Sequence, residues 1–300
     1  MTDRQTTLAG EAAYEGVGLH TGETCHIRFR PAAAGSGIVF VRTDLPGKPE
    51  IKVAPQNAVY DTAQGRRTIL RAADAEVHTV EHLLAAVTGV GIDNLRIELD
   101  AREPGEPADG SAVPFVRLFR DTGMKELDAE REYFEIPHPV RLQHNGAELV
   151  ALPHDGLRLS FTIQYDNPVI GTQHAVYDLV PGVFADEIAP ARTFVLRRDV
   201  EMLREAGLIR GGTIDNAVVV NEDGVANEGG LRFPDEFVRH KILDLLGDLS
   251  LLGRPLKGHV MAWRSGHASH VEFVKTLAEA ERRATGFDLP PRPDGKEHFW

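Results

Sequence analysis

The sequence predicts an α+β protein whose two halves share one order of elements. Each half begins with strand-like runs and continues with an apolar helix that carries a histidine, a glycine-containing turn and a further strand. Between the halves, in KELDAEREYFEI, hydrophobic periodicity lapses and charge concentrates. We therefore expect a boundary near 128–132, with an N-terminal α+β unit over 1–128 and a C-terminal α+β unit over 132–300.

The first half begins with strands and then becomes helical. The runs ETCHIRFRP and GIVFVRTD cluster β-forming residues between Gly and Pro turns, which predicts strands. The pattern at 74–88 predicts a helix that ends at Gly89, and the run NLRIELD after it predicts a strand. The proline-rich segment AREPGEPADGSAVPF predicts a loop that leads into a helix at 112–123.

The second half repeats this order with longer helices. Strands are expected in YFEIPHPVRL, AELVALP, LRLSFTIQYD, NAVVVN and GHVMAWRSG. Helices are expected at 197–206, which the turn GLIRGG follows, at 234–252 and at 268–284. The tail GFDLPPRPDGKEHFW predicts a loop or disorder.

Composition and charge narrow the class of protein. The formal net charge of -12 argues against a general nucleic-acid binder or a protein of anionic membrane surfaces, because both favour basic faces. Cys25 is the only cysteine, so an intramolecular disulfide and a thiolate-rich zinc site are excluded. The N-terminal residues lack a secretory pattern, and the longest uncharged apolar run, LLAAVTGVGI, is too short to span a membrane. A cytoplasmic protein without a transmembrane segment is expected.

The stretch HTVEHLLAA, residues 78–86, contains a motif with two interpretations. His78 and His82 are four residues apart and could share one face of a helix, with Glu81 between them, as in the inverted zinc-peptidase motif H-x-x-E-H. Alternatively, Glu81 and His82 act as a pair and His78 has no part in the site. The motif by itself leaves both possibilities open.

The segment PDEFVRHKILDLLGDLSLLG predicts a helix that is buried on nearly all sides. Within it, His240, Asp244 and Asp248 recur at a spacing of four and form one polar stripe, with Lys241 beside it. Burying a carboxylate without a positive partner costs several kcal/mol, roughly, so a divalent metal held by His240 and Asp244 would explain the stripe. A solvated helix face with an intrahelical His–Asp pair is the simpler alternative.

Several motifs occur together in one order: GVGLHTG, TVEHLLAA, GIDN, DGSAVPF, ARTF, GGTIDNAVVV, EFVRHKILDLLGDL and SGHASH. Over about residues 14–275 the sequence resembles the UDP-3-O-acyl-N-acetylglucosamine deacetylases, the zinc amidases of lipid A biosynthesis. The resemblance implies one Zn²⁺ held by His82, His240 and Asp244. It also implies catalytic roles, which comprise a general base (Glu81), a catalytic histidine (His267), an oxyanion-side hydroxyl (Thr193) and two polar neighbours (Lys241 and Asp248).

The resemblance also implies a fold and a substrate. The family's fold has two similar layered domains, with helices packed against β-sheets and the zinc site in the cleft between them. An inserted β-α-β element, at about 194–220 here, would form an apolar channel for the acyl chain. Candidate substrate contacts are Phe194, Val200, Leu203, Gly212, Val219 and His20. Each of these positions is also compatible with an ordinary packing role.

The implied reaction is hydrolysis of the N-acetyl amide of an acylated UDP-amino sugar. The protein would be a monomer whose partner is this substrate, with at most peripheral contact with the inner membrane. Two other functions remain open at this stage. One is an inverted zinc metallopeptidase that uses His78 and His82 as ligands and Glu81 as base. The other is a non-catalytic protein that binds zinc or a nucleotide sugar, in which Glu81 and His267 would be idle.

Overall fold

The computed structural model describes residues 3–61 and 65–285. The first half contains, in order, β1 (Arg4–Leu8), β2 (Ala12–Val17), β3 (Thr24–Pro31), β4 (Ile38–Arg42), β5 (Glu50–Lys52), the 3-10 turn η1 (Pro55–Asn57), β6 (Ala58–Val59), β7 (Ile69–Ala72), β8 (Ala75–His78), α1 (Glu81–Val90), β9 (Leu95–Leu99), α2 (Val113–Thr122) and β10 (Met124–Glu130).

The second half begins with β11 (Phe134–Glu135), β12 (Val140–His144), β13 (Ala147–Leu152), β14 (Leu157–Gln164) and β15 (Thr172–Asp178). It continues with α3 (Pro181–Val183), the π-helical turn η2 (Phe184–Ile188), β16 (Phe194–Leu196), η3 (Arg197–Asp199), α4 (Val200–Glu205) and β17 (Val218–Val220). It closes with α5 (Glu236–Leu249), η4 (Ser250–Leu252), β18 (Leu256–Trp263) and α6 (His267–Ala284).

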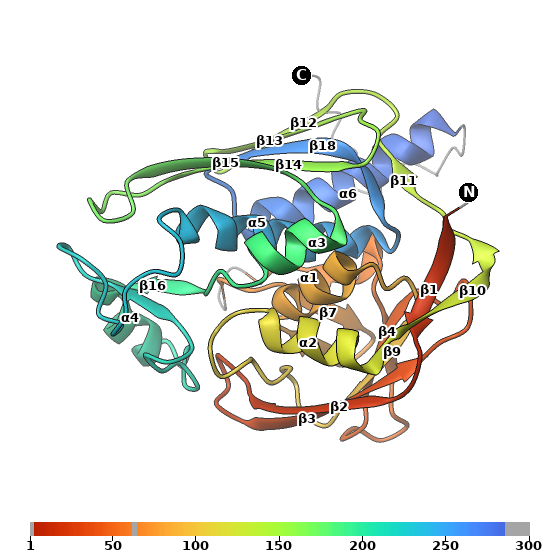
Figure 1. Ribbon diagram of the computed structural model, residues 1–300, viewed down its shortest axis with the longest axis horizontal. Coiled ribbons are helices and arrows are strands. Elements are labelled where there is room, and N and C mark those ends of the chain that lie inside the picture. Colours follow the sequence, from red (N-terminus) through yellow and green to blue (C-terminus); the bar gives the residue numbers. More distant parts are fainter. Residues whose placement is uncertain (1–2, 62–64, 286–300) are drawn as a thin grey trace.

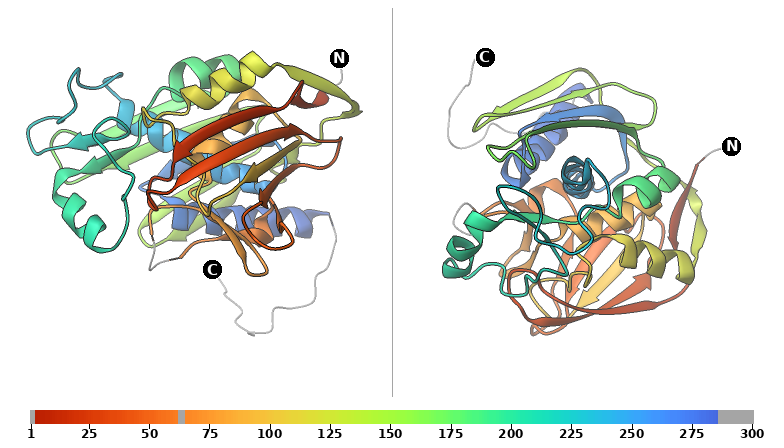
Figure 2. Two further views of the ribbon diagram at one scale, coloured as in Figure 1. Left: turned by 90° about the horizontal axis from the view of Figure 1, so that it is seen from below. Right: turned by 60° about the vertical axis from the view of Figure 1, so that its left-hand side comes forward.

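These elements form four stacked layers (Figure 1). A sheet of strands from the first half lies on one side, with α1 and α2 on its inner face. A sheet from the second half lies on the other side, with α5 and α6 on its inner face, and the two helical layers meet in the middle. The element with β16 and α4 projects to one side of this stack (Figure 2). The structure is therefore mixed α and β, as the sequence predicts.

The main sheets of the two halves have the same strand order. In the first half the order is β2-β3-β9-β4-β5, and in the second it is β12-β13-β18-β14-β15, with β11 added beside β18. In each sheet the last strand of that half lies between two hairpins. Strand β9 is antiparallel to β3 and parallel to β4, and β18 is antiparallel to β13 and parallel to β14. Helices α1 and α5 directly precede these inserted strands, so the two halves place equivalent helices at the centre.

Helices α1 and α5 touch through their backbones. A Cβ atom added at Gly247 of α5 would lie 2.0 Å from the carbonyl oxygen of Glu81, the first residue of α1. A glycine at this point therefore lets two main chains approach more closely than any side chain allows. Leu83, Leu84 and Leu246 are buried in the surrounding core. The predicted metal ligands and Glu81 lie on these two helices.

Gly247→Ala should destabilise the fold, because the added methyl group overlaps backbone atoms that cannot rotate away. Overpacking of this kind costs about 1–3 kcal/mol. Urea unfolding of metal-free protein measures the effect. Gly224→Ala is the matched control, since nothing lies within 4 Å of its added Cβ atom. Equal stabilities of the two variants would contradict the proposed close contact.

The structure differs from the expected secondary structure at several places. The helix expected over 74–88 begins only at Glu81, because Ala75–His78 form β8 and pair with β7. Strands β7, β10 and β15 and the helical segment α3–η2 were also not expected. Strand β15 alternates between half-buried and exposed residues, whereas β10 is mostly exposed and pairs with β1.

The expected boundary near 128–132 lies at the end of β10, and the division into two units there stays a prediction. The tail 286–300, expected as a loop, lies outside the described residues. Among residues 3–61 and 65–285, no helix combines the length and the apolar character that a membrane span requires.

Candidate active site

The polar stripe of α5 is buried, as its apolar surroundings predict. His240, Asp244 and Asp248 are each at most 3% exposed and face α1 of the other half. Glu81 and His82 stand in the first turn of α1, where the helix begins directly after the β7–β8 hairpin. The close contact at Gly247 therefore brings polar groups from two distant parts of the chain together.

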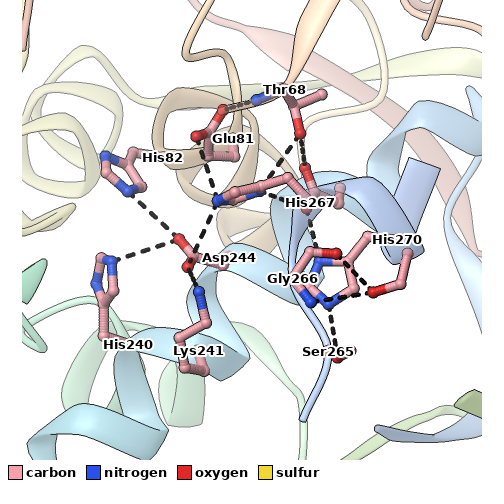
Figure 3. Close-up of polar contacts among 12 residues, drawn as sticks. Thr68, Glu81, His82, His240, Lys241, Asp244, Ser265, Gly266, His267 and His270 are labelled. Carbon is pink, nitrogen blue, oxygen red and sulfur yellow. Dashed lines mark hydrogen bonds and ion pairs between the residues drawn. The ribbon is translucent and has the colours of Figure 1, made fainter. Parts of the chain in front are cut away.

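Three of these side chains form a candidate metal site (Figure 3). The Nε2 atoms of His82 and His240 each lie 3.4 Å from Oδ1 of Asp244. Ligand atoms that surround one zinc ion tetrahedrally are separated by about 3.3 Å, so this spacing fits a shared ion better than a hydrogen bond. Oδ1 of Asp244 is buried and has no hydrogen-bond partner among the described residues. A cation between the three atoms would satisfy it.

Other groups hold each of the three side chains in place. Nδ1 of His82 lies 2.9 Å from Oε2 of Glu106, and Nδ1 of His240 lies 3.2 Å from the carbonyl oxygen of Ala191. Lys241 donates a 2.5 Å hydrogen bond to the second oxygen of Asp244. These contacts turn the Nε2 atoms and Oδ1 toward one point. Sequence reasoning missed Glu106, which lies in a proline-rich loop that carries no motif for this role.

The two histidines differ in their electrostatic surroundings. Burial lowers the pKa of His240 to about 4, so its imidazole is neutral and free to bind a metal. Burial also opposes charge on His82, but the carboxylates of Glu106 and Asp244 outweigh it and raise the pKa of His82. Despite burial, Lys241 and His240 keep the pKa of Asp244 well below its usual range, so it is a carboxylate.

A second buried cluster lies one turn farther along α5. Oδ2 of Asp248 accepts hydrogen bonds from Nδ1 of His267, at 2.8 Å, and from Nδ1 of His270, at 2.7 Å. Oδ1 of Asp248 accepts a 2.6 Å hydrogen bond from the hydroxyl of Thr68. Although these groups could also be grouped as metal ligands, their distances are those of hydrogen bonds and leave no room for an ion. The cluster is therefore a hydrogen-bonded network.

Glu81 lies between the candidate metal site and this network. Its Oε2 accepts a hydrogen bond from the backbone N–H of Thr68, at 3.1 Å, and its Oε1 lies 3.6 Å from Nε2 of His267. Burial raises the pKa of Glu81 to about 7. Burial opposes a charge on His267, but Asp248 and Glu81 outweigh it and raise the pKa of His267 to about 9. A proton acceptor and a proton donor thus lie side by side.

Thr68 connects both carboxylates, and sequence reasoning missed it. Thr68→Val keeps the shape of the side chain and the backbone N–H but leaves Oδ1 of Asp248 without its hydroxyl donor. Leaving a buried acceptor unsatisfied costs about 1–3 kcal/mol, so the variant should unfold at lower urea concentration. Thr68→Ser, which keeps the hydroxyl, is the control. If the valine variant were as stable as the serine variant, the hydroxyl would have no supporting role.

A cavity of about 600 Å³ opens onto these groups. Glu81, the three candidate metal ligands, His267, Thr193 and Lys241 lie in its wall, whereas Asp248 lies behind it. The six candidate substrate contacts all line the same cavity: His20, Phe194, Val200, Leu203, Gly212 and Val219. The polar end carries the ionisable groups, and the element over 194–220 supplies a largely apolar wall. The structure thus brings the predicted residues together, while their individual roles stay predictions.

The two neighbouring glycines Gly211 and Gly212 are placed differently relative to this wall. Only Gly212 lines the cavity, whereas a Cβ atom at Gly211 would lie 2.3 Å from the carbonyl oxygen of Gly18. Gly211 is small because the insert packs against the loop that precedes His20, whose Nδ1 accepts a hydrogen bond from the backbone of Ile209.

His78 takes no part in the candidate metal site. It ends strand β8 instead of sharing a helix face with His82, and its Nε2 lies 2.9 Å from Oε2 of Glu76. The metallopeptidase interpretation required His78 and His82 on consecutive turns of one helix. It also left Asp244 without a role, whereas Asp244 lies 3.4 Å from both His82 and His240. The structure therefore disfavours that interpretation.

His78→Ala should leave metal binding unchanged and lower stability by roughly 1–3 kcal/mol, because a buried hydrogen-bonded side chain is lost. Metal content after dialysis measures the first effect, and urea unfolding measures the second. His82→Ala is the comparison and should lose the metal. Loss of metal from the His78 variant would restore the peptidase interpretation.

A candidate metal site with room for water, a buried carboxylate beside it and a long cavity in front of it define a hydrolytic enzyme. A family model described as UDP-3-O-acyl N-acetylglycosamine deacetylase matches residues 5–279. The chain belongs to this family, and it is therefore a deacetylase.

Individual relatives agree with the family assignment. The UDP-3-O-acyl-N-acetylglucosamine deacetylase of Myxococcus xanthus is 46% identical over 274 residues, which cover 91% of this chain and 86% of that protein. The protein of the same name from Oleidesulfovibrio alaskensis is 44% identical over 278 residues, or 92% of this chain and 90% of that protein. The protein of the same name from Bdellovibrio bacteriovorus is 39% identical over 303 residues, which cover 95% of this chain and 99% of that protein.

Proposed function

We propose that this deacetylase uses one zinc ion to hydrolyse the N-acetyl amide of UDP-3-O-(3-hydroxyacyl)-N-acetylglucosamine. The products are acetate and UDP-3-O-(3-hydroxyacyl)-glucosamine, and the step belongs to lipid A biosynthesis. The convergence of His82, His240 and Asp244 beside Glu81, in the wall of one cavity, carries this proposal. The names of the relatives support the choice of substrate.

The donor set supports zinc as the metal. Two imidazole nitrogens and one carboxylate oxygen are a common set for catalytic zinc, and they leave one tetrahedral position open. When bound, zinc lowers the pKa of a water molecule from about 15.7 to roughly 7 and stabilises negative charge on a carbonyl oxygen. The neutral His240 and the ionised Asp244 are in the protonation states that ligation needs, whereas His82, whose pKa is raised, gives up a proton when a metal binds.

Glu81 and His267 divide the proton transfers in this proposal. Glu81 accepts a proton from the attacking water as the new C–O bond forms at the acetyl carbon. When the C–N bond breaks, the amine nitrogen takes a proton from His267 or from the protonated Glu81. Asp248 holds Nδ1 of His267 at 2.8 Å, so Nε2 of the imidazolium points toward Glu81 and the cavity.

Thr193 and Lys241 are proposed to act on the developing negative charge. Thr193 lines the cavity, and the backbone hydrogen bond from Val218 to its carbonyl oxygen fixes its position at the start of β16. Lys241 is ionised, since Asp244 raises its pKa despite burial, and it also faces the cavity. Removing one such preorganised donor costs about 10²–10³-fold in kcat in other hydrolases.

The apolar part of the cavity is proposed to hold the acyl chain. Phe194, Val200, Leu203 and Val219 present hydrocarbon surface there, Gly212 leaves space, and His20 lies at the boundary with the polar end. The acylated UDP-amino sugar is therefore the proposed partner. We further propose that the enzyme works in the cytoplasm as a monomer, with at most peripheral contact with the inner membrane and none with nucleic acid.

Incubating zinc-loaded protein with the acylated nucleotide sugar tests the proposal, with released acetate as the readout. Acetate should appear in step with the free amine, and the same sugar without its acyl chain should react more slowly. If stoichiometric zinc binds but no acetate appears, a non-catalytic binding protein is the better description. If no zinc binds, the metal site itself is wrong.

A further inference from the structure

Glu106 makes a buried contact that neither the proposed reaction nor the family motifs use. Its side chain is 7% exposed, and Oε2 lies 2.9 Å from Nδ1 of His82. The backbone fixes this carboxylate in place, because the N–H of Glu106 donates to the carbonyl oxygen of Val17 at 3.0 Å. The preceding Gly105 lies against Gly16 so closely that an added Cβ atom would be 2.4 Å from its Cα atom. The loop is therefore anchored on β2.

We propose that Glu106 is a positioning residue that sets how tightly this chain retains its metal. The inference rests on the proposed zinc site. Nε2 of His82 faces Asp244, so a ligating imidazole carries its hydrogen on Nδ1 and donates it to Glu106. This hydrogen bond fixes the tautomer and the ring orientation and makes the imidazole a stronger donor to a metal.

The other histidine provides an internal comparison. Nδ1 of His240 lies 3.2 Å from the carbonyl oxygen of Ala191, a longer contact to an uncharged partner. Only His82 is thus supported by a carboxylate. Lys241 already pairs with Asp244, so a carboxylate at Glu106 adds acceptor and charge support for a divalent cation on the other side of the site. Removing Glu106 should therefore weaken metal binding more than a change in shape alone would.

The test measures the dissociation constant of zinc by competition with a chromophoric chelator. Glu106→Ala should raise this constant by about 10–100-fold. Glu106→Gln should raise it less, because an amide oxygen still accepts the hydrogen bond but carries no charge. Glu103→Gln is the matched control. Glu103 is a buried carboxylate of the same loop that accepts hydrogen bonds from the backbone of His20 and Thr21 and not from a metal ligand.

A second readout separates metal positioning from a merely structural role. Zinc should raise the Tm of the Glu106 variants by less than it raises that of the unaltered protein, since a weaker ligand stabilises less. Glu103→Gln should lower the Tm of metal-free and zinc-loaded protein alike. If Glu106→Ala does not fold, the zinc dissociation constant of Glu106→Gln tests the inference by itself.

The outcomes distinguish the inference from the proposed function. If the unaltered protein binds zinc and releases acetate, but both Glu106 variants bind zinc within twofold of it, the inference is overturned and the proposed function stands. If the unaltered protein binds no zinc, the proposed function fails, and the inference falls with it.

Discussion

Glu81→Gln is expected to lower kcat by about 10²–10⁴-fold, the range that general acid–base catalysis contributes. Glutamine has nearly the same shape and can still accept the hydrogen bond from the backbone of Thr68, but it cannot take a proton from water. Because the three candidate metal ligands are untouched, the variant should keep its full zinc content. The loss should therefore appear in turnover and not in metal binding or folding.

Acetate release under saturating substrate measures this effect, together with the zinc content of the same samples. Glu76→Gln is the control, because Glu76 lies two residues before the end of β8, pairs with Arg71 and His78, and does not line the cavity. Its kcat should stay within about twofold of the unaltered enzyme. A Glu81 variant with near-normal turnover would show that another group accepts the proton.

Asp244→Asn should weaken zinc binding by more than about 100-fold, which is the upper end of what the loss of a supporting outer contact costs. Asp244 contributes the only carboxylate oxygen of the candidate ligand set, and Oδ1 has no other partner among the described residues. An amide of the same size removes the charge and leaves the shape. Turnover should disappear along with the metal, and excess zinc should restore part of it.

Asp248→Asn is the matched control for this change, since it lies one turn away on the same buried face of α5. It holds His267 and His270 and is not a candidate metal ligand. We expect it to bind zinc within a few-fold of the unaltered protein while kcat falls. Equal zinc affinities in the two variants would exclude Asp244 as a ligand.

Much of the fold follows from local patterns in the chain. Helices α2, α5 and α6 were expected within three residues of their observed bounds, because their hydrophobic periodicity is strong and turn residues flank them. The sequence predicted that the helix containing α1 begins at residue 74, whereas it begins at Glu81. No Gly or Pro separates Ala75–His78 from the helix, so the local sequence does not mark the boundary. Only the pairing with β7 makes these residues a strand.

The site was predictable where a motif carries it and not where packing creates it. His240 and Asp244 recur at helical spacing in an apolar segment, so their burial and convergence could be expected. Thr68 and Glu106 contact the site from loops, and nothing in their local sequence indicates this. His270 lies in the SGHASH motif, but the motif alone does not show that it contacts Asp248. Such contacts depend on the relative placement of distant elements, which local periodicity does not encode.

The backbone contact at Gly247 has a mechanical consequence for access. Because the main chains of Glu81 and Gly247 pack directly against each other, the two halves cannot move apart as a hinge without separating Glu81 and His82 from His240 and Asp244. In the proposed function, the substrate therefore enters with its acyl chain toward the element over 194–220 and its amide toward the candidate metal site. Linear acyl chains should fit this cavity, and bulky, branched chains should be excluded at its opening.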